Sequence, residues 1–564
     1  MTPAPGERTP VAIIGAGPVG LVAALLLARY GVPSEVFERH PAPYPLPRAV
    51  HMDDEVMRIL QAVGAADAFA ARSRPALGMQ LVDAQHRVLA RFLRDDPLGA
   101  NGYPQANMFD QPELEHILRD LLKRQPLIRL HGDTEVLSLT LPPPGTGRST
   151  SIRVKDLHSG AERTVHADAV LGCDGATSLT RQAIGSRHQV LGRPQHWFVI
   201  DVRCPIPLPV WEGVHQVCDP ARPATYMRIG EDRYRWEFRL NEEEAEAALT
   251  NRARALELLA PWTGTIPEHQ LDVVRMARYT FRAQVADRWR QDRAFLLGDA
   301  AHLTPPFIGQ GLGAGLRDAH NLTWKLARVL HGQSTEALLD TYERERRPHA
   351  VHLVRTAVLI GQAMTSGRLA ARIARRAGLA VGRHTALLSH AVLTTLSPAF
   401  QGGALARRTA APARGPRPGE LGPQPSVHTV NGDAVRLDDL LGDGFALVTC
   451  RPLTSGEIRL AGALPARILT VLPAGVQPTG KEDGACAIDT TGALHSWLKG
   501  GMALLRPDHV VLAAEHGKSG SLLESAHAWA QILASAGAVE EDDAANPAHG
   551  SARLETVAKA AVNA

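Results

Sequence analysis

Residues 11–20 read Val-Ala-Ile-Ile-Gly-Ala-Gly-Pro-Val-Gly and indicate the fold class. The first four residues form a short apolar run, which is typical of a parallel strand that is buried on both faces. Three glycines then follow in the spacing Gly-x-Gly-x-x-Gly, and the apolar, alanine-rich residues from Leu21 to about Tyr30 predict a helix. A second strand is expected over residues 34–37, ending at Glu38. The pattern predicts an α/β fold that begins with a strand, a tight turn and a helix.

Each glycine of this turn has its own expected task. Gly15 permits the turn, Gly17 lets a pyrophosphate approach the backbone, and Gly20 lets the helix pack closely on the strand. Glu38 lies close to the offset of about 20 residues at which an acid binds the ribose of a dinucleotide. Because strand, glycines, helix, second strand and acid all occur in the required order, the sequence predicts a Rossmann-like dinucleotide-binding domain.

A second segment, residues 294–326, indicates which dinucleotide is bound. An apolar strand ends in Gly298-Asp299, the stiff Pro305-Pro306 turn follows, and a glycine-rich loop opens a long helix. Such a helix N-terminus leaves backbone N–H groups free to face an anion or an electron-rich ring. The glycines of residues 309–315 fall at every second position and follow prolines rather than a strand, so they are not a second Rossmann fingerprint. One permanently bound dinucleotide is therefore expected, which favours FAD over NAD.

Three motifs occur in a fixed order along the chain. They are Gly15 to Gly20 with Glu38-Arg39, then Asp174-Gly175-Ala176 with Ser178 and Arg181, and then Gly298-Asp299 with Pro305-Pro306. In these motifs the chain resembles the FAD-dependent aromatic hydroxylases, which are single-component flavoprotein monooxygenases, over residues 10–400. Within that family it is most similar to the hydroxylases of 3-(3-hydroxyphenyl)propionate and 3-hydroxycinnamate. Hydroxylases of aromatic polyketides and of rifampicin share much of the same pattern.

The resemblance implies an FAD monooxygenase that uses NADH or NADPH as electron donor and O2 as co-substrate. It would hydroxylate a phenolic ring through the C4a-hydroperoxide of the flavin. The expected reaction converts 3-(3-hydroxyphenyl)propionate and 3-hydroxycinnamate to their 2,3-dihydroxy products in aromatic catabolism. A hydroxylase of secondary metabolism, acting on aromatic polyketides or rifampicin, is the alternative. A non-oxygenating flavin reductase, which would keep the same FAD motifs, is a more distant one.

The resemblance also implies an α/β architecture of several domains: a Rossmann-like FAD-binding domain, an inserted β-sheet domain that covers the substrate, and a thioredoxin-like C-terminal domain. The expected parts are the FAD-binding domain at 10–180, the covering sheet at 181–285, the second FAD-binding part with helices at 286–400, a linker at 401–426, the thioredoxin-like domain at 427–537 and a disordered tail at 538–564. Cys450 lacks the second cysteine of a Cys-x-x-Cys pair, so dithiol chemistry is not expected there.

The family's motifs assign candidate residues for FAD. They are Gly15, Ala16, Gly17, Pro18, Gly20, Glu38, Arg39, Arg48, Gln111, Asp174, Gly298, Asp299, Ala300, Pro306, Gly311, Leu312 and Gly313. Backbone N–H groups around Leu312 are expected to stabilise the negative charge of reduced flavin. Many relatives carry Asn where this chain has Gly313, so a side-chain brace on the isoalloxazine is expected to be absent.

Residues for catalysis and for the substrate follow from the same resemblance. The expected catalytic residues are Pro306, Phe307 and Arg48. The substrate candidates in the covering sheet are Arg222, Tyr226 and Arg235, with Arg228 as a further arginine. Arginine is the residue of interest because it binds a carboxylate in bidentate fashion.

Some of these residues have simpler interpretations. Asp174 could cap the turn that follows a strand, and Arg48 could be a solvated surface arginine. His302 lies three residues after Asp299 and is interpreted as a hydrogen-bonded structural histidine, because the chemistry can proceed without a general base there.

The composition sets limits on other functions. At 564 residues and 45% hydrophobic, the chain can bury a large core in two or three domains. A formal net charge of +3 gives no reason to expect a nucleic-acid partner. The N-terminus lacks an apolar signal core and no apolar run approaches ~20 residues, so a cytoplasmic protein with no membrane partner is expected. The five cysteines are scattered and are expected to be reduced, no metal site is suggested, and a homodimer is considered as the assembly.

Overall fold

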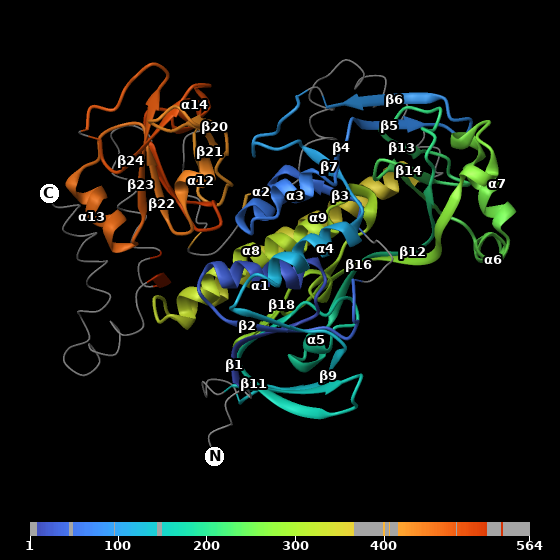
Figure 1. Ribbon diagram of the computed structural model, residues 1–564, viewed down its shortest axis with the longest axis horizontal. Helices are drawn as coiled ribbons and strands as arrows, with labels where there is room; N and C mark the ends of the chain where they lie inside the picture. The colour runs from blue at the N-terminus through green and yellow to red at the C-terminus, as the bar shows by residue number, and fades with distance from the viewer. Residues whose placement is uncertain are drawn as a thin grey trace.

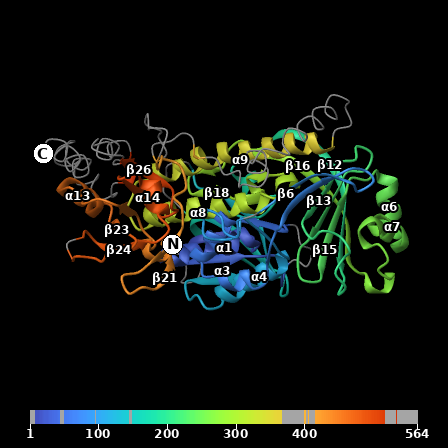
Figure 2. The ribbon, with the colours of Figure 1, turned by 90° about the horizontal axis from the view of Figure 1, so that it is seen from above.

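The computed structural model describes residues 8–43, 49–94, 96–143, 149–365, 399–400, 405, 415–480, 482–515, 529 and 532–533. Three large β-sheets and one small sheet organise this part of the chain (Figure 1). The first sheet lies in the middle, and the second and third lie at opposite ends of the molecule, as the view from above shows (Figure 2).

The first sheet contains the predicted βα unit. β1 (Arg8–Ile14) pairs in parallel with β2 (Ser34–Phe37) on one side and with β11 (Glu162–Gly172) on the other. The sheet continues in parallel from β2 to β8 (Ile128–His131) and from β11 to β18 (Ala294–Leu296). The antiparallel additions are β9 (Thr134–Thr140), β10 (Thr150–Asp156) and β17 (Arg290–Gln291). The second half of β1 is fully buried, as its apolar run predicts for a parallel strand.

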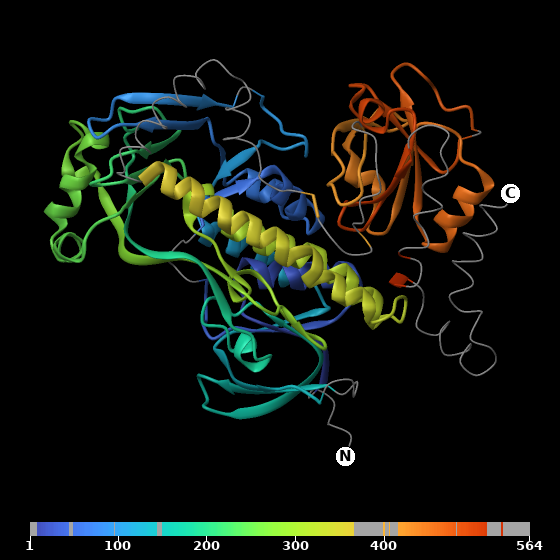
Figure 3. The same cartoon turned by 180° about the vertical axis from the view of Figure 1, so that it is seen from behind.

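Long helices pack beside this sheet. α1 (Pro18–Arg29) begins three residues before the predicted Leu21, because Pro18 fits the first helical position, where its missing N–H is not needed. α1 packs on α4 (Gln111–Leu122) and on α8 (Gly311–Leu330). α9 (Ala337–Thr365) packs on α8 and crosses the back of the molecule (Figure 3).

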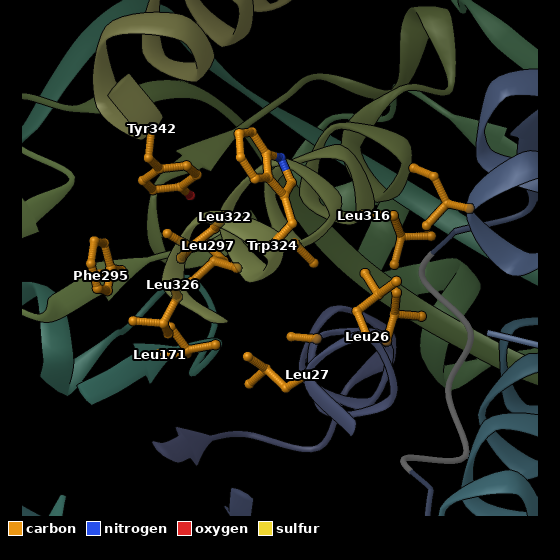
Figure 4. Packing of buried hydrophobic residues seen from close by; sticks show 14 of the residues in the cluster. Leu26, Leu27, Leu171, Phe295, Leu297, Leu316, Leu322, Trp324, Leu326 and Tyr342 are labelled. Carbon is orange, nitrogen blue, oxygen red and sulfur yellow. The ribbon is translucent and has the colours of Figure 1, made fainter. Parts of the chain in front are cut away.

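The main core joins these helices to the strands. Figure 4 shows Leu26 and Leu27 of α1 in one cluster with Leu316 and Trp324 of α8 and with Phe295 of β18. Burying one such side chain contributes roughly 1.5–3 kcal/mol. α8 is therefore fixed by its apolar face, which positions its N-terminus.

The second sheet is mostly antiparallel and receives strands from three parts of the chain. Its order is β19 (His302–Leu303), β16 (Asp272–Ala286), β12 (His188–Arg203), β15 (Arg233–Phe238), β14 (Ala224–Arg228), β13 (Val214–Val217), β5 (Gly78–Val82) and β6 (Val88–Leu93). β5 and β6 come from the range expected to belong to the first FAD-binding part. α6 (Glu242–Thr250) and α7 (Arg252–Thr263) pack at its outer end, where Trp262 joins Trp236 in a separate core.

The third sheet forms the C-terminal part. Its order is β21 (Ala434–Arg436), β20 (Ser426–His428), β24 (Ala485–Asp489), β23 (Arg467–Pro473), β22 (Ala446–Thr449), β25 (Met502–Leu505) and β26 (Val511–Glu515). β22, β23 and β24 are parallel, and the outer strands are antiparallel. Its helices are α12 (Leu437–Leu441), α13 (Ser455–Ala463) and α14 (Ala493–Leu498).

Short elements complete the described chain. They are β3 (His51–Asp53), β4 (Arg74–Pro75) and β7 (Ala106–Met108) of the small sheet, helices α2 (Asp54–Ala62), α3 (Ala66–Ala70) and α5 (Leu179–Ala183), and the 3-10 turns η1 (Glu268–Gln270), η2 (Gly298–Ala300) and η3 (Pro306–Ile308). Within the described ranges no helix has the length and apolar character needed to cross a membrane. Arg48, half of the expected linker (residues 401–404 and 406–414) and the expected tail lie outside those ranges.

Candidate active site

A cavity of about 1630 Å³ is lined by residues of both the first and the second sheet. Four parallel strands of the first sheet end at its wall. Its lining includes Ile14, Phe37, Cys173 and Leu297, which lie at or directly after the carboxyl ends of β1, β2, β11 and β18. Open α/β sheets bind their ligands at this edge.

The turn between β1 and α1 requires glycine at two positions. Gly15 has a φ of +100°, and a Cβ atom there would lie 2.4 Å from the carbonyl oxygen of Cys173. A Cβ atom on Gly20 would lie 2.0 Å from the carbonyl oxygen of Gly15. The N–H of Gly15 donates to the carbonyl of Phe37 at 2.8 Å, which ties the turn to the end of β2. The turn and the close helix packing thus have the geometry that the glycine spacing predicts.

The N-terminus of α1 opens on the cavity. Gly17 is its N-cap residue, no described side chain caps the first turn, and that turn contains no acidic residue. A Cβ atom built on Gly17 would meet nothing within 4 Å, so there is open space in front of the helix. Uncapped N–H groups with space before them suit an anion such as a pyrophosphate.

Glu38 lies beside this turn, on the cavity wall. Its Oε2 accepts a hydrogen bond from the N–H of Ala16 at 2.8 Å, and its Oε1 accepts one from the N–H of His40 at 3.0 Å. Arg39 is exposed at the rim. The carboxylate of Glu38 therefore lies where an acid for a ribose is expected in this fold.

Asp174 lines the cavity, and its carboxylate also orders its own loop. Oδ1 accepts from the hydroxyl of Ser178 at 2.6 Å. Oδ2 accepts from the N–H and the hydroxyl of Thr180 at 2.9 and 3.0 Å. Arg181 then donates to the carbonyl of Ala300 at 3.0 Å. Asp174 makes the turn-capping contacts that its simpler interpretation predicts, and the loop it orders is joined to η2.

A buried ion network holds the Gly298-Asp299 loop from behind. Asp318 accepts hydrogen bonds from the N–H of Gly298 at 3.0 Å, from Nε2 of His302 at 2.8 Å and from Nε of Arg346 at 2.8 Å. Burial acts to raise the pKa of Asp318, but Arg346 and His302 outweigh it and lower that pKa. Arg346 also donates to the carbonyl of Ala314 at 3.1 Å. The network joins the loop to the first turn of α8, while Asp299 lines the cavity.

A second uncapped helix N-terminus belongs to α8. Its N-cap residue, Gln310, makes no capping bond in the described structure, because its Oε1 accepts from Nη1 of Arg317 at 3.0 Å. Gly311 and Leu312 line the cavity directly after the turn η3. Nδ1 of His51 lies 3.4 Å from the carbonyl oxygen of Gly309. Burial first, and then the charge of Arg94, lower the pKa of His51 to about 4, so the ring is neutral at neutral pH.

An aromatic wall lies next to η3. The ring of Phe307 meets that of Trp197 at a centroid distance of 5.8 Å, and Trp197 meets Phe281 at 5.9 Å. All three rings line the cavity. Flat apolar surfaces of this kind suit an aromatic ring, which prefers edge-to-face or offset contacts.

Charged groups lie farther along the second sheet. Arg235 is 1% exposed and donates to Asp201 from Nε at 2.6 Å and from Nη2 at 2.9 Å. Nη1 of Arg275 lies 3.9 Å from the same carboxylate. Glu237 is buried beside them, and burial raises its pKa. Arg235, Arg275 and Glu237 line the cavity, so this part of it is polar but internally paired.

The structure brings most of the predicted FAD residues to one cavity. The predicted residues that line it are Gly15, Ala16, Gly17, Pro18, Glu38, Arg39, Gln111, Asp174, Gly298, Asp299, Pro306, Phe307, Gly311 and Leu312. Gly20, Ala300 and Gly313 lie behind that lining. A Cβ atom on Gly313 would lie 2.8 Å from Nη1 of Arg317, so a side chain at this position would enter that contact rather than the cavity. Arg48 lies outside the described residues.

Of the predicted substrate residues, some line the cavity and others lie outside it. Arg235 reaches the cavity, but as a partner of Asp201. Arg222 is outside the lining and forms an exposed ion pair with Glu244 at 2.6 Å. Tyr226 is 1% exposed and belongs to the aromatic core around Trp236. Arg228 pairs with Glu212, also outside the lining.

Sequence reasoning missed several cavity residues on other elements. They are Arg94, Trp197, Glu237, Arg275 and Phe281. A covering sheet was expected over residues 181–285, but that expectation did not identify the face of β12 and β16 that meets η3. That face depends on the pairing register, in which Trp197 lies opposite Tyr279.

The residues present fit a flavin dinucleotide. Two helix N-termini without side-chain caps, those of α1 and α8, open on one cavity, and an acid lies beside the glycine turn of the first. The open space before Gly17 leaves room for phosphate oxygens. The first helix suits the pyrophosphate and the second suits an electron-rich ring system.

Comparisons with known proteins agree with this geometry. The family model described as "FAD binding domain" matches residues 8–357, and that described as "HcaD C-terminal domain" matches residues 419–528. A probable NADH-specific resorcinol 4-hydroxylase of Rhodococcus jostii is 32% identical over 504 residues, covering 89% of this chain and 91% of that protein. A 3-(3-hydroxy-phenyl)propionate/3-hydroxycinnamic acid hydroxylase of Burkholderia vietnamiensis is 32% identical over 529 residues, covering 90% and 94%.

Solved structures extend the likeness to the whole fold. Aklavinone-11 hydroxylase, in a ternary complex with FAD and aklavinone, is 25% identical, with a TM-score of 0.75 over 94% of this chain and 100% of that one. The flavin-dependent monooxygenase PieE has the same fold, with a TM-score of 0.76 at 23% identity over 94% and 100%. The match covers the C-terminal sheet as well as the cavity. The chain therefore belongs to the family of FAD-dependent monooxygenases that hydroxylate aromatic compounds.

Proposed function

We propose that the protein hydroxylates 3-(3-hydroxyphenyl)propionate and 3-hydroxycinnamate to their 2,3-dihydroxy products, with NADH or NADPH as electron donor and O2 as co-substrate. The observation that carries the proposal is the cavity itself, in which an aromatic wall of Trp197, Phe281 and Phe307 adjoins the two uncapped helix N-termini. The similarity to the Burkholderia hydroxylase supports the choice of substrate.

FAD would be held along the edge of the first sheet. We assign the pyrophosphate to the residues around Gly17 and the adenosine ribose to Glu38, and we assign the ribityl chain to Asp299. When bound, FAD accepts a hydride from the nicotinamide and activates dioxygen for transfer of one oxygen atom to the ring. The N–H groups at Gly311 and Leu312 would stabilise negative charge on the reduced ring system.

The chain's own residues orient the phenol and keep water away. The carbonyl of Pro306 is proposed to accept the hydrogen bond of the substrate hydroxyl, and Phe307 and Trp197 to hold the plane of the ring. His51 is neutral at neutral pH, so it adds no positive charge beside the turn. A dry, aromatic pocket strengthens each of these polar contacts.

Turnover with purified FAD-loaded protein tests the proposal. NADH oxidation and products are measured with 3-(3-hydroxyphenyl)propionate, resorcinol and a polyketide phenol, under isotopically labelled dioxygen. Acceleration by the propionate, with one labelled oxygen in a catechol product, is the expected result. NADH oxidation without a hydroxylated product from any phenol would leave a flavin reductase and contradict the proposal.

Two other substrates have specific support. Resorcinol is named for the Rhodococcus relative, and an aromatic polyketide is bound in the aklavinone hydroxylase structure. Exclusive hydroxylation of one of these compounds in the same assay would replace the proposed substrate.

The division of labour among the sheets is also a proposal. We assign residues 10–180 and 286–400 to FAD binding, 181–285 to covering the substrate, and 427–537 to a thioredoxin-like domain. The parallel strands β22 and β23, followed by the antiparallel pair β25 and β26, support the last assignment. Asp299→Ala is expected to lose FAD on gel filtration, and full retention of FAD would contradict the role given to Asp299.

A further inference from the structure

Arg94 lies on the cavity wall, directly after strand β6 at the top of Figure 1. Its backbone N–H donates to the carbonyl of Leu77 at 3.1 Å, which fixes the position of the residue. Its side chain is partly buried, and its Nε has no hydrogen-bond acceptor among the described residues. Burial lowers the pKa of Arg94 to about 10, which still leaves the guanidinium charged at neutral pH.

No carboxylate among the described residues forms an ion pair with Arg94. The other arginines of the second sheet that reach the cavity differ in this respect. Arg235 is held by two hydrogen bonds to Asp201, and Arg275 lies 3.9 Å from the same carboxylate. Glu237 lies beside both of them. The uncompensated positive charge of this part of the cavity is therefore that of Arg94.

The surroundings of Arg94 leave its charge without local compensation. Phe92 and Met79 line the cavity beside it and are apolar. His51 is near enough for the charge of Arg94 to lower its pKa, after the larger effect of burial, and it is neutral. Because His51 also lies 3.4 Å from the carbonyl of Gly309, Arg94 is on the side of the cavity where the turn η3 is.

A partly desolvated arginine without an acid is costly, and a ligand carboxylate offsets that cost. The guanidinium presents planar donors that match a carboxylate in bidentate geometry. An acid carried by the phenol can meet this charge, because Arg94 and the aromatic wall line the same cavity. A phenol without an anionic group would leave this charge unmatched.

We propose that Arg94 is the residue that binds the carboxylate of the aromatic substrate, and that it selects acidic phenols over neutral ones. This inference rests on the proposed function, because it assigns the substrate to the same cavity. It assigns the role to an arginine of the first 100 residues instead of those expected between residues 222 and 235.

The test compares Arg94→Gln and Arg94→Lys with the wild-type holoenzyme. Binding is followed by the change in the visible spectrum of oxidised FAD on titration with 3-(3-hydroxyphenyl)propionate and with its neutral primary amide. Loss of a charge-assisted hydrogen bond is expected to raise the Kd of the acid about 10- to 100-fold in Arg94→Gln. The Kd of the amide is expected to stay within about 2-fold, and Arg94→Lys is expected to keep part of the affinity for the acid.

Arg91→Gln is the matched control. Arg91 lies in β6, three residues before Arg94. It is exposed, donates to Gln80 at 2.8 Å and lies outside the cavity lining. It is expected to bind both ligands as the wild type does. Equal loss of acid and amide in Arg94→Gln, or a raised KM for NADH with unchanged acid binding, would overturn the inference. Selective acid binding in a protein that forms no catechol would sustain it and reject the proposed function, so the two failures are distinguishable.

Discussion

Replacing Glu345 by Gln should weaken the contact between the C-terminal sheet and the helices α8 and α9. Glu345 is fully buried on α9. It accepts hydrogen bonds from Nζ of Lys325 at 2.7 Å, from Nδ2 of Asn321 at 2.8 Å and from Nη1 and Nη2 of Arg506 at 2.9 and 3.0 Å. Arg506 lies between β25 and β26, so one carboxylate joins three elements. Burial acts to raise the pKa of Glu345, but Arg506 and Lys325 outweigh it and lower that pKa.

The expected cost follows from the charges left behind. Removing one partner of a buried ion pair costs about 3–5 kcal/mol. The lower end applies here, because Arg506 keeps its ion pair with Asp508 at 2.5 Å and Lys325 can lose its proton. Burial has already lowered the pKa of Lys325 to about 8, in spite of Glu345. About 3 kcal/mol is a substantial share of the roughly 5–15 kcal/mol by which a protein is stable.

Thermal unfolding of the FAD-loaded protein and limited proteolysis measure the effect. Glu345→Gln is expected to lower Tm by about 2–3 °C and to expose residues 415–515 to protease. Glu336→Gln is the control, because Glu336 is 51% exposed, pairs with Arg293 on the surface and should cost less than about 1 kcal/mol. Equal Tm values for the two variants would refute the reasoning that the buried carboxylate fastens the C-terminal sheet.

Three further predictions concern the glycine turn, the loop network and pH. Gly20→Ala should reduce the FAD content measured on gel filtration, because its Cβ atom would lie 2.0 Å from a carbonyl oxygen. Gly462→Ala is the control and should retain FAD, because its Cβ atom would meet nothing within 4 Å. Equal FAD contents in the two variants would contradict the prediction. Asp318→Asn breaks buried charge pairs, so it should lower the free energy of unfolding by about 3 kcal/mol and weaken FAD binding. Urea unfolding and flavin fluorescence measure the two effects, and an unchanged urea midpoint would count against the prediction. Burial lowers the pKa of His320 and of His509 to about 4, whereas a histidine of the unfolded chain has a pKa of about 6.5. Between these two pH values the unfolded state binds more protons than the folded state. The free energy of unfolding should therefore fall as the pH is lowered from 6.5 to 5, by up to about 2 kcal/mol for each ring. The double Gln variant should flatten this dependence in urea unfolding, and an unchanged pH slope would refute it.

The parts of the site built from local sequence were predictable. The strand, turn and helix at residues 11–29 and the start of α8 depend on glycine and proline at fixed offsets, and such requirements are visible in the chain. Gly15 and Gly20 have the close contacts that their spacing predicts. The position of Asp174 at the cavity was also predicted, whereas its contacts with Ser178 and Thr180 are those of its simpler interpretation.

The parts that depend on strand register were not predictable. Asp201 lies directly opposite Arg235 across the pair β12 and β15. In this register the guanidinium that was predicted to bind a substrate is paired with Asp201 instead. A shift of one residue would send Arg235 to the other face of the sheet. Tyr226 is in the same situation, because the aromatic core at the outer end of the sheet takes its ring. The residue types were suitable, but their partners come from distant segments.

The position of Arg94 shows why the first and second sheets must be considered together. β5 and β6 come from the part of the chain assigned to FAD binding. β5 pairs with β13 and β6 pairs with β5, so the second sheet contains strands from that part. Arg94 follows β6 and lies on the cavity wall. Its charge has no acidic partner among the described residues, which is unfavourable unless a ligand supplies an acid. The three proposed sites thus come from different elements: the flavin site from β1, β2 and α8, the ring surface from β12 and β16, and the anion site from the end of β6. Specificity for an acidic phenol can therefore change at residue 94 without any change in the segments proposed to hold FAD.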